Sequence, residues 1–182
     1  MKSGKHDCLF SGEPRQLADP VSTNAGAGYA SLTASANGLL LYDSSNTLWQ
    51  FTWFDRGGKQ LKVVGEPGSY SNFSLSPDGR RLAAARNGET GEDLWVIELE
   101  RGVASRLTST PGVSNWPVWS PDSRTIVFSG AARNLFRKAA SGAEDAQPLT
   151  HSAFLQNPLD WSRDGRFILF YQFQNARRDL WF

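Results

Sequence analysis

The chain has few of the residues that build metal sites and nucleophilic active centres. Its 182 residues include one cysteine, Cys8, and two histidines, His6 and His151. One cysteine cannot form an internal disulfide, and these three side chains cannot supply the four ligands of a tetrahedral zinc site. A Ser-His-Asp triad has no suitable base here. The sequence therefore predicts no metal, no cofactor and no catalytic residue.

The chain also lacks a strong net charge and long apolar runs. Its formal net charge is +1, which gives no broad electrostatic attraction to nucleic acid or to an anionic membrane. No apolar run approaches the 18–20 residues of a membrane span. The first ten residues contain no apolar core of a signal peptide. We expect no nucleic-acid partner and no membrane insertion, while the compartment stays open.

Helical periodicity is almost absent, whereas residues that favour β structure are frequent. No window keeps an apolar face for three helical turns without a glycine or proline. Seven tryptophans, eleven phenylalanines and seventeen glycines favour strands and turns. The composition indicates an all-β domain.

One tetrapeptide pattern recurs four times, with each copy followed by a β-rich apolar run. The copies begin at Ser35, Ser76, Ser120 and Ser162, at intervals of 41, 44 and 42 residues. Self-similarity at that period, with four short strands and glycine turns in each unit, is typical of a β-propeller blade. The sequence thus predicts a propeller of four-stranded antiparallel blades, about four in number.

The best-preserved copy, Ser76-Pro77-Asp78-Gly79, fits a type I turn followed by a left-handed residue. Ser123 replaces the glycine, which predicts a positive φ there at a cost of roughly 1 kcal/mol. Arg163 replaces the proline. A calcium-loop reading of the aspartates fails, since each tetrapeptide supplies one carboxylate at most.

The repeats predict the division of the chain. Residues 1–28 are a tail carrying outer strand material of another blade, and four blades span residues 29–68, 69–112, 113–154 and 155–182. The last blade lacks an outer strand. Either the N-terminal strand completes it, or the chain is part of a larger ring. An open blade edge also suggests self-association.

Two strings, residues 73–83 and 118–128, resemble the WD40-like (PD40) repeat of TolB-type β-propellers. The likeness covers residues 29–182, and it implies a non-catalytic, extracytoplasmic binding module with a protein or peptide partner. Residues 53–59 are similar to a segment of the propellers appended to bacterial serine/threonine kinases. An accessory or gating domain of a kinase or of a prolyl-oligopeptidase-like peptidase is therefore the alternative. The chain itself has no Gly-x-Ser-x-Gly elbow and no kinase motifs.

Two sets of residues are candidates for binding. The recurring aromatics are expected to pack between blades rather than to form stacking platforms; they are Trp95, Trp119, Phe136, Trp161 and Trp181. Positions at the start of the inner strands line the central channel in the family that the chain resembles. They give the predicted channel-mouth site: Tyr70, Asn72, Asn115, Trp116, Gln156 and Asn157. Amide groups there supply donors and acceptors for a peptide or small ligand, although asparagine also suits a turn that enters a strand.

Overall fold

The structure is a computed structural model that describes residues 23–24, 29–30, 32–34, 40–42, 48–89, 91–109 and 112–182. The chain divides into two units, Met1–Asn46 and Thr47–Phe182. In the first unit, β1 (Thr23–Asn24) pairs with β2 (Tyr29–Ala30), and β3 (Leu32–Ala34) pairs with β4 (Leu40–Tyr42), both antiparallel. The predicted turn at Ser35 and residues 1–22 and 25–28 of the predicted tail lie outside the described residues.

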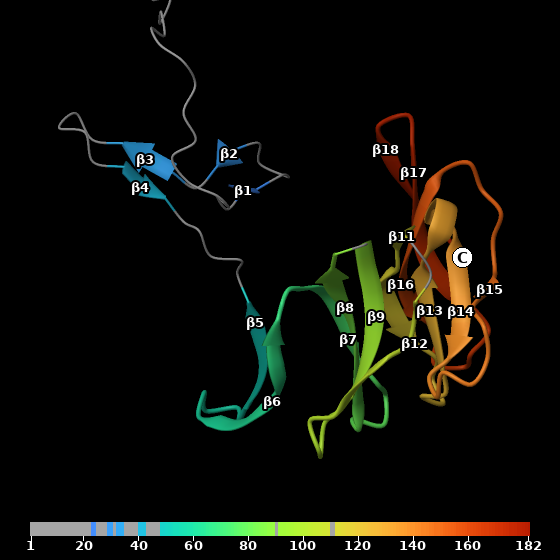
Figure 1. The fold of residues 1–182 in the computed structure, drawn as a ribbon. Coiled ribbons are helices and arrows are strands. Elements are labelled where there is room, and N and C mark those ends of the chain that lie inside the picture. The colour runs from blue at the N-terminus through green and yellow to red at the C-terminus, as the bar shows by residue number, and fades with distance from the viewer. Residues whose placement is uncertain are drawn as a thin grey trace, which may run out of the picture. The chain divides into compact units, whose positions relative to one another are not determined.

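The second unit begins with a hairpin and continues with three sheets (Figure 1). The hairpin pairs β5 (Trp49–Phe54) with β6 (Gln60–Gly68). Its turn is held by the Asp55 carboxylate, which accepts hydrogen bonds from the backbone N–H groups of Gly57 and Lys59 at 2.8 and 2.9 Å. The chain thus reverses through a local carboxylate cap.

Each of the next two sheets contains a four-stranded antiparallel meander. The first has the order β10-β9-β8-β7, with β11 added parallel to β9, and the second has the order β12-β13-β14-β15. Their bounds are β7 (Tyr70–Leu75), β8 (Arg81–Gly88), β9 (Gly91–Glu98), β10 (Ala104–Arg106), β11 (Gly112–Val113), β12 (Asn115–Trp119), β13 (Thr125–Ser129), β14 (Leu135–Ala139) and β15 (Gln147–Pro148).

The last sheet has three antiparallel strands, in the order β16-β17-β18. They are β16 (Leu155–Trp161), β17 (Ile168–Gln174) and β18 (Arg177–Trp181). A 3-10 turn at Ala131–Arg133 is the only helical element in the described part of the chain. The all-β prediction is confirmed, whereas the exact blade boundaries stay a prediction.

Three of the four tetrapeptide turns lie in described residues, and they share one hydrogen-bond pattern. In the middle turn the Ser120 hydroxyl donates to Asp122 Oδ1 at 2.6 Å and accepts from the Thr125 N–H at 2.9 Å. The Arg124 N–H donates to the same carboxylate at 3.0 Å. The turns at Ser76 and Ser162 repeat these bonds. The aspartates therefore close turns, as the sequence predicts.

The fourth position of each turn has the predicted left-handed backbone. φ is 69° at Gly79, 61° at Ser123 and 75° at Gly165. Serine thus occupies a conformation that favours glycine.

Alternation along β8 divides the core into two clusters. Leu82 and Ala84 pack on one side with the residues of the β5–β6 hairpin, while Ala83 and Ala85 pack on the other. Because successive side chains of a strand point to opposite faces, one strand serves both clusters. The small side chains leave room for Trp119 and the large residues of β13, which fill the space between the sheets.

The expectation that recurring aromatics fill the core holds for some of them. Trp119 is buried and Phe136 packs against the same cluster. Trp95 is half-buried, with the Arg86 guanidinium 5.4 Å from its ring centroid. For Trp181 the expectation is wrong, because 49% of its surface is exposed at the outer edge of the last sheet.

Candidate functional site

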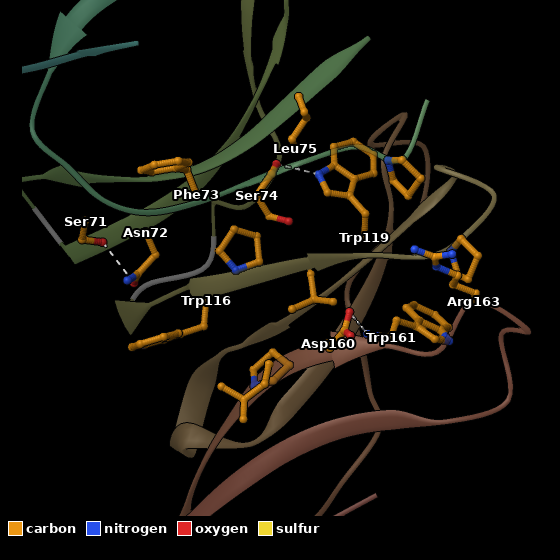
Figure 2. Close-up of a pocket in the computed structure, with 16 residues that line it drawn as sticks. Ser71, Asn72, Phe73, Ser74, Leu75, Trp116, Trp119, Asp160, Trp161 and Arg163 are labelled. Atoms are coloured by element: carbon orange, nitrogen blue, oxygen red, sulfur yellow. Dashed lines mark hydrogen bonds between the residues drawn. The ribbon is translucent and has the colours of Figure 1, made fainter. Parts of the chain in front are cut away.

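The inner strands β7, β12 and β16 line one groove of about 950 Å³ (Figure 2). All three strands contribute, and the turns that follow them add Pro77, Pro121 and Arg163. A groove that crosses three repeat units places side chains from positions about forty residues apart on one surface. We therefore take it as the candidate site of the second unit.

Apolar side chains dominate the lining of this groove. Phe73 is 63% exposed and Leu159 is 41% exposed, so both present apolar surface to solvent. Trp161 lies half-buried at the β16 end. Exposed large apolar groups gathered in a concave surface are typical of an interaction site.

The charged side chains of the groove are few. Asp160 and Arg163 are the only charged side chains in the lining, and both are exposed. Asp160 Oδ1 accepts a hydrogen bond from the Trp161 N–H at 2.8 Å, which fixes the carboxylate at the edge of β16 (Figure 2). A carboxylate and a guanidinium near one end of an apolar groove can orient a ligand that carries both signs of charge.

Two of the six predicted site residues, Asn72 and Trp116, line the groove. Asn72 is half-buried, and its Oδ1 lies 3.4 Å from the Ser71 hydroxyl oxygen, whose single proton is donated to Glu92 (Figure 2). That long contact leaves the amide available to a ligand.

Trp116 is held in an unusual backbone conformation. Its φ is 55°, uncommon for a bulky residue, and it lies within the bulge of β12 between Asn115 and Val118. Its ring meets the Tyr171 ring edge-on, with the centroids 6.2 Å apart. The bulge therefore turns the indole toward the neighbouring sheet while leaving part of it in the groove.

Tyr70 and Asn115 are used within the protein. Tyr70 is buried, and its hydroxyl donates to the Glu66 carbonyl at 3.2 Å while its ring packs on Phe51. The Asn115 amide donates to Glu92 Oε2 at 2.9 Å, and the Ser71 hydroxyl donates to the other oxygen of that carboxylate. Glu92 thus links the inner strands of two sheets.

Gln156 and Asn157 are both buried in a polar network at the start of β16. Gln156 accepts from the Thr150 hydroxyl at 2.5 Å and donates to Gln172 at 2.9 Å. In the amide orientation that pairs each donor with an acceptor, Asn157 donates to Ser129 Oγ at 3.1 Å and accepts from Trp116 Nε1 and the Tyr171 hydroxyl at 3.2 and 2.5 Å. A binding role for the six residues stays a prediction.

The sequence reasoning missed several residues of the groove. Phe73 lies between the half-buried Asn72 and Ser74, and Leu159 lies between the buried Pro158 and the exposed Asp160, so strand periodicity alone did not indicate either residue. Arg163 occupies the proline position of its tetrapeptide, and the structure places its guanidinium group in the groove lining. The replacement of proline by arginine at this position was the sequence feature that could have indicated Arg163 as a site residue.

Two negative findings apply to the described residues. None of their His, Cys, Asp and Glu side chains form a group of three or more that could hold a metal ion together. No helix in that part of the chain is long and apolar enough to cross a membrane.

Comparison with curated protein sequences gives three relatives of interest. An uncharacterized protein of Agrobacterium fabrum is 28% identical over 115 residues, covering 61% of this chain and 39% of the relative. The uncharacterized peptidase YuxL of Bacillus subtilis is 33% identical over 112 residues, or 56% of this chain and 17% of YuxL. Dipeptidyl-peptidase 5 of Porphyromonas gingivalis is 24% identical over 127 residues, or 60% and 19%. The chain therefore spans well under half the length of each relative. No protein-family profile matches it.

Solved structures with a similar fold include two TolB chains. TolB from Acinetobacter baumannii aligns with a TM-score of 0.62 at 16% identity, over 72% of this chain and 34% of that one. A putative TolB from Agrobacterium tumefaciens aligns with a TM-score of 0.62 at 23% identity, over 83% and 56%. The fold is thus that of a TolB-like β-propeller.

Proposed function

We propose that this chain is a non-catalytic binding module that holds an extended peptide segment of a partner protein in the groove over β7, β12 and β16. The observation that carries the proposal is the exposed apolar lining of that groove, with Phe73 and Leu159 on different strands and Asp160 and Arg163 at one end. The TolB-like fold supports a role in binding.

The lining favours a peptide over a compact polar ligand. Four prolines line the groove, at positions 77, 117, 121 and 158, and a proline has no N–H to donate. The groove offers a ligand the faces of proline and aromatic rings together with apolar side chains. Such a surface suits extended, proline-containing or apolar peptides. The opposite charges of Asp160 and Arg163 give such a peptide a direction.

A library of extended peptides displayed on phage tests the proposal on the full chain. We expect enriched sequences whose synthetic peptides bind saturably, and Phe73→Ala or Leu159→Ala to weaken their binding about tenfold. The matched control is Phe173→Ala, which removes a ring that is 42% exposed on β17, outside the groove. Absence of enriched peptides, or equal affinities for all three variants, would overturn the proposal.

Alanine at Asn115, Trp116 and Asn157 is a less selective test. Two of these side chains join neighbouring sheets through the Glu92 and Ser129 contacts. Loss of binding in such a triple variant would not separate a damaged site from a damaged fold. Phe73 and Leu159 reduce this ambiguity because they are 63% and 41% exposed. The one ring contact of Phe73 in the described residues is with Phe51, edge-on with the centroids 5.2 Å apart.

A second candidate is an accessory or gating propeller of a larger enzyme. It is favoured by YuxL and dipeptidyl-peptidase 5, both named as peptidases, of which this chain matches 17% and 19%. The kinase version of this candidate is supported by the resemblance of residues 53–59 alone. Sequencing the gene on both sides of this region decides: a Gly-x-Ser-x-Gly elbow followed by acid and histidine supports the peptidase version, and kinase motifs support the other.

A further inference from the structure

An arginine fills the space between the tetrapeptide turns of the first two sheets. Arg81 begins β8, and its guanidinium lies 5.0 Å from the ring centroid of Trp119 on the neighbouring sheet. Its Nη2 donates to the Ser123 carbonyl, in the turn that follows this tryptophan, at 2.5 Å. A guanidinium, an indole face and a turn carbonyl thus form one unit at this first interface.

The next interface, between the second and the last sheet, repeats the indole but not the arginine. Trp161 precedes the turn of the last sheet as Trp119 precedes the turn of the second. Thr125 holds the position of Arg81, since the N–H group of each donates to the first serine hydroxyl of its own turn at 2.9 Å. A threonine side chain ends at its γ atoms, so the guanidinium of the first interface has no counterpart at this position.

A hollow of about 530 Å³ lies at this second interface. Thr125 lines it from the second sheet, and Trp161 and Gly165 line it from the last sheet. We call it the turn hollow. Trp161 is half-buried, and in the described part of the chain no guanidinium or ammonium group stacks on its ring. The short side chain at position 125 therefore coincides with open space that the indole also lines.

Charged side chains line the turn hollow, with one more carboxylate than cation. The carboxylates are Asp122, Glu144, Asp145 and Asp164, and the cations are Arg137, Lys138 and Arg163. Arg137 is engaged within the protein, because its Nη2 donates to Gln147 Oε1 at 3.1 Å. One added cation balances the charges of the lining, so a positively charged ligand is the kind that this hollow favours.

We propose that the turn hollow binds a guanidinium group, carried by an arginine side chain of a second polypeptide or by free arginine. The group stacks on the Trp161 ring as Arg81 stacks on Trp119, and it donates to the Gly165 carbonyl and to the carboxylates of the lining. The Gly165 carbonyl accepts from Trp161 Nε1 at 3.2 Å and keeps a second lone pair for the ligand. A planar guanidinium combines stacking with donation in its own plane, whereas an ammonium group is a compact point charge.

The probe is acetyl-arginine N-methylamide, titrated into the full chain while the indole N–H signal of Trp161 is followed by NMR. Comparison with Trp161→Phe identifies that signal. We expect a saturable shift with a Kd in the millimolar range. Acetyl-citrulline N-methylamide has nearly the same shape but no charge, so it should bind at least about tenfold more weakly. Free arginine is titrated in parallel, and the tighter of the two cationic probes identifies the source of the guanidinium.

Thr125→Arg tests the location of the site by supplying the arginine of the first interface from within the chain. Its guanidinium should occupy the turn hollow and abolish the saturable shift, while the Trp119 indole signal stays in place and reports an intact fold. Gln60→Arg is the matched control, because it adds the same charge at an exposed position on β6 and should leave the Kd unchanged.

Removal of two carboxylates gives a second test that does not fill the hollow. Glu144 and Asp145 are exposed and lie outside the tetrapeptide turns, so the double variant Glu144→Gln, Asp145→Asn should fold normally. It should weaken binding of the arginine probe about tenfold and leave the citrulline probe unaffected.

The proposal is independent of the peptide groove, although Trp161 and Arg163 line both. Phe73→Ala in the groove should leave the Kd of the arginine probe unchanged, so failure of one proposal is distinguishable from failure of the other. No saturable shift up to about 100 mM probe would overturn the guanidinium site. Equal binding of the citrulline probe, unchanged binding to Thr125→Arg, or weaker binding to Phe73→Ala would also overturn it.

Discussion

Ser123 Oγ accepts a hydrogen bond from the Asp78 backbone N–H, with 3.1 Å between oxygen and nitrogen. This bond joins the tetrapeptide turns of two neighbouring sheets. The Ser123 carbonyl also accepts from Arg81 Nη2 at 2.5 Å. Serine stands here where the other two described turns have glycine, at a φ of 61°. The side chain that strains its own turn thus bonds to the neighbouring sheet, which offsets the conformational cost.

Substitutions at Ser123 separate these two effects. Ser123→Ala keeps the strained φ and loses the bond, so we expect the free energy of unfolding to fall by about 1–2 kcal/mol. Ser123→Gly also loses the bond but relieves strain worth about 1 kcal/mol, so its net effect should be close to zero. Urea unfolding of both variants measures the difference.

The control is Gly165→Ser in the last described turn. An added Cβ there meets no atom within 4 Å, so the serine gains no partner. It should cost about 1 kcal/mol from its φ alone. Equal stabilities for Ser123→Ala and Ser123→Gly would contradict the explanation given for Ser123.

Trp119 joins the same two sheets and should be sensitive to loss of its indole N–H. Its Nε1–H donates to the Ser74 carbonyl at 2.9 Å, and the Arg81 guanidinium lies 5.0 Å from its ring centroid. Because the residue is only 4% exposed, Trp119→Phe leaves a carbonyl without its partner. We expect a loss of about 1–3 kcal/mol in the free energy of unfolding.

Trp161 is the matched comparison, since it holds the equivalent position in the last repeat. Its Nε1–H donates to the Gly165 carbonyl of its own turn at 3.2 Å, and the ring is half-buried. Trp161→Phe should therefore cost less than Trp119→Phe in the same denaturant titration. A larger cost for Trp161 would show that the indole bond to Ser74 is not what stabilises the pair of sheets.

The fold could be predicted because its signals are local. The Ser-x-Asp turn at Ser120 depends on bonds within five residues, so the tetrapeptide alone specified its geometry. The positive φ at Ser123 followed from its place in the pattern. Its bond to Asp78 did not, because the two residues are 45 positions apart and only packing of the sheets brings them together.

The candidate site was harder to predict because its residues depend on neighbouring sheets. Asn157 looked available in the sequence, yet Ser129 and Tyr171 satisfy its amide. Phe73 was not among the predicted site residues, yet it is 63% exposed in the groove. Strand periodicity assigns a residue to a face but does not say what covers that face.

The turn aspartates should make stability depend on pH in the acid range. Hydrogen bonds from the Ser76, Ser120 and Ser162 hydroxyls hold the pKa values of Asp78, Asp122 and Asp164 below the ordinary value of 3.8. A lowered pKa in the folded state adds stability above the unfolded pKa and loses it as the pH falls through the folded pKa. Stability should therefore decline as the pH drops below about 4.

Asp122→Asn tests this dependence. The variant should be less stable than the parent chain at neutral pH, and the gap should close as the solution is acidified, because the parent then loses its own charged acceptor. Thermal unfolding followed by circular dichroism at a series of pH values measures the gap. A gap that stays constant into acid would show that the charge of Asp122 does not contribute. Glu144→Gln is the control, because Glu144 is an exposed carboxylate outside the tetrapeptide turns. Its substitution should not change how stability depends on pH.

Asn157 and Asn72 distinguish a structural amide from a binding amide. Asn157 is 4% exposed and connects Ser129, Trp116 and Tyr171, so Asn157→Ala should lower the free energy of unfolding by about 1–3 kcal/mol. Asn72 is half-buried in the groove with a 3.4 Å contact to Ser71, so Asn72→Ala should change stability by less than about 0.5 kcal/mol. Tryptophan emission during urea unfolding measures the stability of both variants. Trp116, which bonds to Asn157, is one of the emitting residues. If Asn157→Ala leaves stability unchanged but abolishes binding of a groove peptide, Asn157 is a ligand contact and not a link between the last two sheets.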